Sequence, residues 1–144
     1  MRISRFEEIE GWKLGRELTK AIYVLTRKPG FARDYGLRDQ IQRAGGAIMH
    51  NIAEGFDSGS NAEFVRFLRY AKRSCTEVQS EIYMALDQDY VTKKEFEELY
   101  ETARLTRAKL GAFIRYLQNA ETPKPKPVHR DQSKPGTLNR EPRT

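Results

Sequence analysis

Residues 35–86 read YGLRDQIQRAGGAIMHNIAEGFDSGSNAEFVRFLRYAKRSCTEVQSEIYMAL, and this stretch decides the fold. In its first half, a set of mostly small or apolar residues recurs at alternating steps of four and three: Leu37, Ile41, Ala44, Ile48, Asn51 and Gly55. This spacing forms a seam along one face of an α-helix, which packs on a partner helix. A second run of apolar residues with helical spacing begins after Gly59, so the stretch predicts two long helices joined at residues 55–59.

We assign structural roles to five residues in and beside the joint between these helices. Gly55 is expected to end the first helix in a left-handed conformation, which glycine adopts at no steric cost. Ser60 and Glu63 have the spacing of a capping box that starts the next helix. We interpret the polar seam residue Asn51 as a register device and Glu54 as an acceptor for loop N–H groups, in preference to a ligand site.

The first helix of the chain is predicted to start at a capping box, Ser4–Glu7, and to end near Lys28, before Pro29 and Gly30. Its seam comprises Ile9, Trp12, Gly15, Leu18, Ile22 and Leu25. The helix after the joint is predicted from Asn61 to about Leu86, with Phe64, Leu68, Ala71, Cys75, Val78, Ile82 and Ala85 on its seam. Cys75 is therefore expected in the core.

A last helix is predicted to begin at a third capping box, Thr92–Glu95, which Val91 and Phe96 flank at the positions of a hydrophobic staple. Its seam comprises Phe96, Leu99, Ala103, Thr106, Leu110, Phe113 and Leu117. Four amphipathic helices with short connections predict an all-α, up-down-up-down four-helix bundle over residues 1–119. Residues 120–144 contain five of the six prolines and few apolar residues, so they are expected to form a disordered basic tail.

The composition favours a single cytoplasmic domain with an acidic partner. The chain has 144 residues, one cysteine and a formal net charge of +6. A lone cysteine forms no internal disulfide, and no apolar run is long enough to span a membrane, so a reducing cytoplasm is the expected location. The excess of positive charge makes nucleic acid the first candidate among partners.

The basic side chains gather in two helical segments that antiparallel packing brings to one end of the bundle, and the tail continues from that end. We predict that these residues bind nucleic acid: Arg66, Arg69, Lys72, Arg73, Arg104, Arg107, Lys109, Arg115, Lys124, Lys126 and Arg130. The opposite end, residues 77–103, is mostly acidic. A solvated charged face without a partner is the alternative interpretation.

The sequence offers little for catalysis. His50, with Glu54 one turn away, is the sole candidate in the fold for a general base or metal ligand, and the inward Glu-x-x-His repeats of a di-iron bundle do not occur. Glu77 and Glu81 share a helix face and are expected to pair with neighbouring cations. We therefore expect no catalytic residue, metal or cofactor, and a protein that is not an enzyme.

Several of these residues form a recognisable pattern: Tyr35-Gly36-Leu37, Gln40-Ile41, Arg43-Ala44, Asn51-Ile52-Ala53-Glu54-Gly55-Phe56, Ser60, Glu63-Phe64, Phe67-Leu68, Ala71, Ser74 and Glu77. The pattern resembles the four-helix bundle proteins encoded in intervening sequences of bacterial 23S ribosomal RNA genes. The opening Phe6-Glu7-Glu8-Ile9 with Trp12 is similar to the start of that family, and the resemblance covers about residues 6–118.

This resemblance implies a non-catalytic homopentamer. The accessory proteins of diversity-generating retroelements look like relatives, and there a basic pentameric barrel is associated with nucleic acid and a reverse transcriptase. Two hypotheses follow: an oligomer that binds RNA or DNA electrostatically, or an adaptor that holds a protein such as a reverse transcriptase. The sequence departs from the family at Gly45-Gly46, where alanine-like residues are usual, and at Asp57-Ser58-Gly59, where an arginine is usual.

Overall fold

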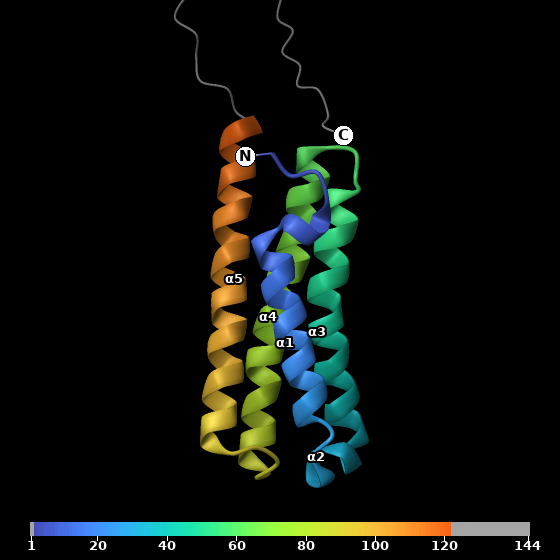
Figure 1. Cartoon of the computed structure of the whole chain (residues 1–144), viewed down its shortest axis with the longest axis vertical. Helices are drawn as coiled ribbons and strands as arrows, with labels where there is room; N and C mark the ends of the chain where they lie inside the picture. The colour runs from blue at the N-terminus through green and yellow to red at the C-terminus, as the bar shows by residue number, and fades with distance from the viewer. Residues whose placement is uncertain (1, 122–144) are drawn as a thin grey trace, which may run out of the picture.

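The computed structural model describes residues 2–121, in which every regular secondary-structure element is a helix, so the all-α prediction is confirmed. Its elements are η1 (Phe6–Glu8), α1 (Glu10–Leu25), α2 (Pro29–Arg33), α3 (Tyr35–Phe56), α4 (Asn61–Asp87) and α5 (Lys93–Glu121). Figure 1 shows α1, α3, α4 and α5 side by side with alternating directions, and the short α2 at the end where α1 turns into α3. The tail predicted for residues 120–144 lies almost entirely outside the described residues.

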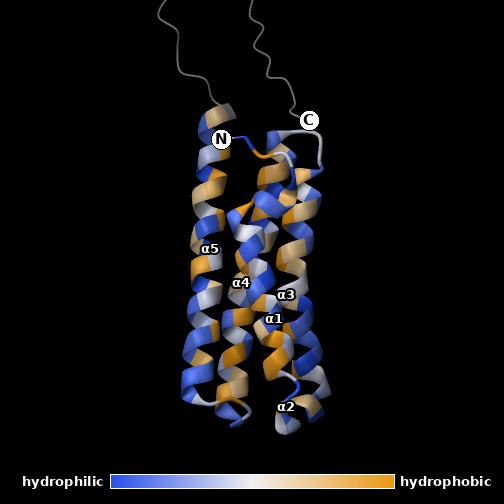
Figure 2. Cartoon of the chain, viewed as in Figure 1, coloured by the Kyte–Doolittle hydropathy of each residue, from blue (hydrophilic) through white to orange (hydrophobic). Residues whose placement is uncertain are grey.

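The core lies along the predicted seams. Figure 2 shows apolar residues recurring between polar ones along each long helix, as such seams require. All seven predicted seam residues of α4 are buried, and Cys75 is fully inside. In α5, Thr106 is buried and its hydroxyl donates to the Thr102 carbonyl at 2.7 Å, which satisfies the one polar seam position. The helices of the bundle contact one another in a cycle, in which α4 packs on α3 and α5, and α1 packs on both of these from the other side.

Asn51 is not the buried register device that the sequence predicts. It is half-buried, and its side-chain amide donates to the Ala47 carbonyl of its own helix at 2.8 Å. The core position belongs to the next residue, Ile52, which is fully buried. A helix turns about 100° per residue, so this one-residue difference moves the amide to the rim of the interface.

The prediction of a left-handed cap at Gly55 is wrong. Gly55 lies within α3, and no glycine among the described residues has a positive φ. A Cβ atom built on Gly55 would lie 2.8 Å from the Phe67 Cβ and 2.9 Å from the Phe64 Cδ1. Gly55 is therefore needed because α4 approaches α3 so closely that no side chain fits between them.

We expect a Gly55→Ala substitution to lower the free energy of unfolding by about 1–2 kcal/mol, because the methyl group overpacks the contact with Phe64 and Phe67. Gly46→Ala is the matched control, since a Cβ there meets nothing closer than 3.6 Å. That substitution should raise the free energy of unfolding by about 0.5–1 kcal/mol through helix propensity. Urea denaturation measures both, and equal changes in the two variants would contradict the role given to Gly55.

The helix starts follow the predictions in part. Thr92 and Glu95 form both bonds of the capping box, at 2.9 and 3.1 Å, and Glu95 also pairs with Lys28, which lowers the pKa of its carboxyl. At the first predicted box, Ser4 instead bonds Glu8, and a 3-10 turn precedes α1. The start of α3 has a cap that was not predicted from the sequence: the Asp34 side chain accepts from the Leu37 N–H at 3.1 Å.

Candidate nucleic-acid interface

The predicted basic residues of α4 and α5 lie near one end of the bundle, as antiparallel packing requires, but acidic residues share that end. Glu7, Glu54 and Asp57 line one hollow between the N-terminal segment and the C-terminal end of α3, together with Arg5. These acids were not part of the basic end predicted from the sequence. Positive charge is therefore a property of the α4 and α5 side of the bundle and not of the whole end.

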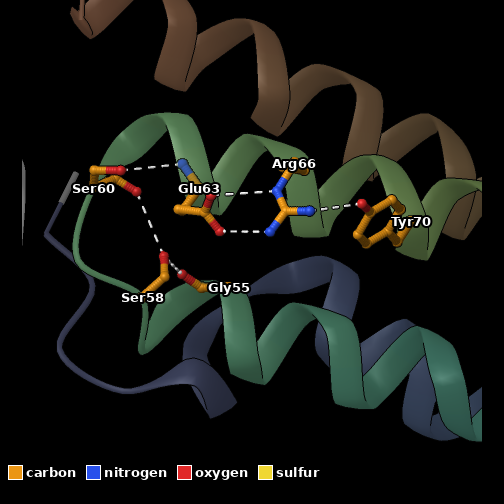
Figure 3. A network of polar contacts seen from close by, with 6 residues as sticks. All are labelled: Gly55, Ser58, Ser60, Glu63, Arg66 and Tyr70. Atoms are coloured by element: carbon orange, nitrogen blue, oxygen red, sulfur yellow. Dashed lines mark hydrogen bonds and ion pairs between the residues drawn. The ribbon is translucent and has the colours of Figure 1, made fainter.

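Two of the predicted cations are already engaged within their own helices. The Arg66 guanidinium donates to the Glu63 carboxylate at 3.0 Å and to the Tyr70 hydroxyl at 2.8 Å, as Figure 3 shows, and the bond to Glu63 raises the pKa of Arg66. Arg104 pairs with Glu101 at 2.6 Å in the same i,i+3 arrangement. These pairs reduce the positive charge that Arg66 and Arg104 present to a ligand.

The same network explains the joint between α3 and α4. Ser60 accepts from the Glu63 N–H at 3.2 Å, which confirms one half of the predicted capping box, while the Glu63 carboxylate bonds Arg66. The Ser58 hydroxyl donates to the Gly55 carbonyl and so closes the loop (Figure 3). Glu54, which we expected to accept from loop N–H groups, is exposed and lines the hollow beside Asp57.

Three other cations converge from two helices. A Cβ atom on Gly111 of α5 would lie 3.8 Å from the Lys72 Nζ and 3.7 Å from an Arg115 guanidinium nitrogen, so both cationic groups lie beside the same glycine. Lys72 and Arg107 both lie near enough to the Cys75 thiol for their charges to act on its pKa. We name Lys72, Arg107 and Arg115 the basic triad. Within residues 2–121, none of the three forms an ion pair with a carboxylate.

The remaining predicted cations differ in position. Arg69 and Arg73 are exposed on α4, on either side of Lys72, and the Arg73 guanidinium lies 5.5 Å from the Tyr70 ring centroid. Lys109 instead faces α1, because it lines a hollow with Glu10 and Gly11. Lys124, Lys126 and Arg130 lie outside the described residues.

Glu81 is a site that sequence reasoning missed. We expected it to pair with a cation, but it is half-buried, and its Oε1 is inaccessible and has no hydrogen-bond partner among the described residues. Burial, with a smaller contribution from Glu77, raises the pKa of Glu81 from 4.5 to about 7. Phe67, Ser74 and Glu81 are spaced by seven residues on one flank of α4, and the contact of Phe67 with Gly55 shows that this flank faces α3.

The candidates for chemistry are placed as follows. Burial raises the pKa of the Cys75 thiol to about 12, against the opposing charges of Arg107 and Lys72, so this cysteine is a core residue as predicted. His50 is exposed on α3. Within residues 2–121, no group of three or more His, Cys, Asp or Glu side chains has the arrangement of a metal site. None of the helices described is both long and apolar enough to cross a membrane.

Comparison with known proteins places the chain in a family. No curated protein sequence matches it. A crystal structure of a protein of unknown function from the S23 ribosomal protein family of Bacteroides thetaiotaomicron matches with a TM-score of 0.67 and 19% sequence identity, over 73% of this chain and 98% of that one. The model of the 23S rRNA-intervening sequence protein family matches residues 7–112. The chain therefore belongs to the 23S rRNA-intervening sequence protein family.

Proposed function

We propose that this chain is a non-catalytic protein that binds nucleic acid through the α4 and α5 side of its bundle. The observation that supports this most is the basic triad, in which Lys72, Arg107 and Arg115 lie together without a carboxylate partner. Uncompensated cations that repel one another are stabilised by an anion that bridges them. A phosphate backbone supplies such anions at regular intervals.

The proposed contact is electrostatic and independent of base sequence. Arg69 and Arg73 extend the triad along α4, and both side chains are exposed. Each neutralised phosphate releases condensed counterions, so the affinity falls as salt is added. The basic residues of the tail, including Lys124, Lys126 and Arg130, would add further contacts of the same kind.

We also propose that the chain acts as a homo-oligomer, and the resemblance to its family implies a pentamer. Several large apolar side chains are exposed at the surface and are available for subunit contacts, among them Val24 of α1 and Met84 of α4, which are 57% and 50% exposed. An assembly in the cytoplasm would present several basic triads to one polyanion. Either a ribosomal RNA intervening sequence or a retroelement, with its reverse transcriptase as a protein partner, is a genetic setting that fits this proposal.

The test is a fluorescence-anisotropy titration of a labelled single-stranded RNA of about 20 nucleotides with the protein. The titration is repeated with DNA of the same sequence and at several salt concentrations. If three phosphates contact each triad, the plot of log affinity against log salt should have a slope of about −2 or steeper. Deleting residues 120–144 should weaken binding of both nucleic acids. Absence of a complex at about 10 μM protein and about 50 mM salt would contradict the proposal, since nonspecific binding is strongest there.

Light scattering on the same sample gives the subunit number. A mass several times that of one chain supports the oligomer, and the mass of a single chain contradicts it. This measurement is independent of the titration, so each half of the proposal can fail alone.

A further inference from the structure

Three aromatic rings meet at the end of the α4–α5 hairpin that lies away from the basic triad. The Tyr83 ring lies 4.8 Å from the Phe96 ring and 5.7 Å from the Tyr100 ring, and the Phe96 and Tyr100 rings are 5.5 Å apart, all between centroids. Phe96 and Tyr100 are half-buried, whereas Tyr83 is 48% exposed. We name Tyr83, Phe96 and Tyr100 the aromatic patch.

The aromatic patch differs from three rings elsewhere on the bundle, which arginine side chains cover. Arg16 lies over Trp12, Arg38 over Tyr35, and both Arg66 and Arg73 over Tyr70, at 4.9–5.9 Å from the ring centroids. Within residues 2–121, no cation lies over Tyr83, Phe96 or Tyr100. Arg104, one turn after Tyr100, is held by Glu101.

The rim of the aromatic patch is acidic. Asp87 follows Tyr83 by four residues on α4, and Glu97 precedes Tyr100 by three residues on α5, so both carboxylates lie beside the rings. Asp89 is exposed in the adjoining turn. Lys93 and Lys94 lie one turn before Glu97, and Lys94 is paired with Glu98. Outside that pair and the pair of Arg104 with Glu101, Asp87, Asp89 and Glu97 exceed the single charge of Lys93.

We propose that the aromatic patch binds an arginine-bearing segment of a partner protein. A guanidinium group stacks on an aromatic face and also forms paired bonds with a carboxylate, and the patch offers both kinds of group side by side. A lysine segment matches the charge but stacks less well. Nucleic acid fits this surface poorly, because its phosphates would face Asp87 and Glu97.

The proposal goes beyond nucleic-acid binding and assigns the two ends of the α4–α5 hairpin to different partners. The triad end accepts anions, and the patch end accepts cations. Since the whole chain carries a net charge of +6, any cationic peptide that binds it must do so at a local acidic surface.

The test uses the full chain with fluorescein-labelled nonapeptides of arginine and of lysine at low salt. We expect the arginine peptide to bind about threefold or more tightly than the lysine peptide. Tyr83→Ser should weaken binding of the arginine peptide about fivefold, and Asp87→Asn with Glu97→Gln by at least as much. Tyr35→Ser, which removes another exposed ring, and Glu54→Gln with Asp57→Asn, which remove two exposed acids at the other end, are the controls and should change nothing.

Four results would overturn the proposal. The first is no measurable binding of the arginine peptide, and the second is equal weakening by the control variants, which would show nonspecific attraction. The third is loss of oligonucleotide binding in Tyr83→Ser, which would assign the patch to nucleic acid. The fourth is a fall in subunit number in Tyr83→Ser by light scattering, which would assign it to a second copy of the chain.

Discussion

Reversing the three charges of the basic triad, in a Lys72→Glu, Arg107→Glu and Arg115→Glu variant, is expected to lower the affinity for RNA or DNA at least about 100-fold at low salt. The three substitutions remove the anion site and replace it with carboxylates that repel phosphate. Because the side chains converge from α4 and α5, all three losses act on one stretch of the bound backbone. Fluorescence anisotropy measures the change.

The control for this variant has the same net charge. Lys20, Arg27 and Arg43 are exposed cations on or near α1 and α3, away from the triad, and reversing them should weaken binding about tenfold or less. A triple alanine variant of the triad guards against misfolding from charge reversal, and its circular dichroism should match that of the unsubstituted chain. Equal losses of affinity in the triad and control variants would show that net charge, and not the triad, determines binding.

The second large effect concerns Glu81, whose ionisation should destabilise the fold. Its pKa is about 7 in the folded chain and 4.5 ordinarily, so the folded state holds a proton that the unfolded state releases at lower pH. The protonated Glu81 carboxyl makes its full contribution to stability at pH values below its ordinary pKa of 4.5. That contribution is lost as the pH rises toward and past 7. With allowance for solvent screening, the loss should be about 2 kcal/mol.

Glu81→Gln should remove most of this pH dependence, because the amide keeps the shape and carries no charge. We expect the variant to be about 2 kcal/mol more stable than the unsubstituted chain near pH 9 and about equal to it near pH 4. Urea denaturation at both pH values measures the difference. Glu97→Gln, at an exposed residue, is the control and should leave the profile unchanged; a Glu81→Gln profile that also stays unchanged would contradict the burial of this carboxyl.

The helices and their core faces could be predicted because they depend on periodicity within one segment. The seam of α4 and the capping box at Thr92 and Glu95 are local patterns, and the structure contains both. Gly55 could not be interpreted in this way. A glycine near a helix end serves either a left-handed turn or a close approach, and the choice depends on Phe64 and Phe67 of another helix.

The candidate site shows the same division. The pairs of Glu63 with Arg66 and of Glu101 with Arg104 have i,i+3 spacing and could have been recognised from the sequence as neutralised cations. The convergence of Lys72 with Arg115 depends on the axial register of α4 against α5, which no local pattern specifies. Glu81 was missed for a similar reason, since its burial follows from how closely α3 covers the flank of α4.

The measurement that tests the basic triad most directly is lysine acetylation of the full chain with and without a saturating oligonucleotide, read residue by residue by mass spectrometry. Acetylation of Lys72 reports on the basic triad. Lys109 reports on the surface of α5 that faces α1, and Lys20 reports on α1 itself. We expect the oligonucleotide to slow acetylation of Lys72 several-fold and to leave Lys109 and Lys20 nearly unchanged. Unchanged acetylation of Lys72, together with protection of Lys109 or Lys20, would contradict the interface proposed on α4 and α5.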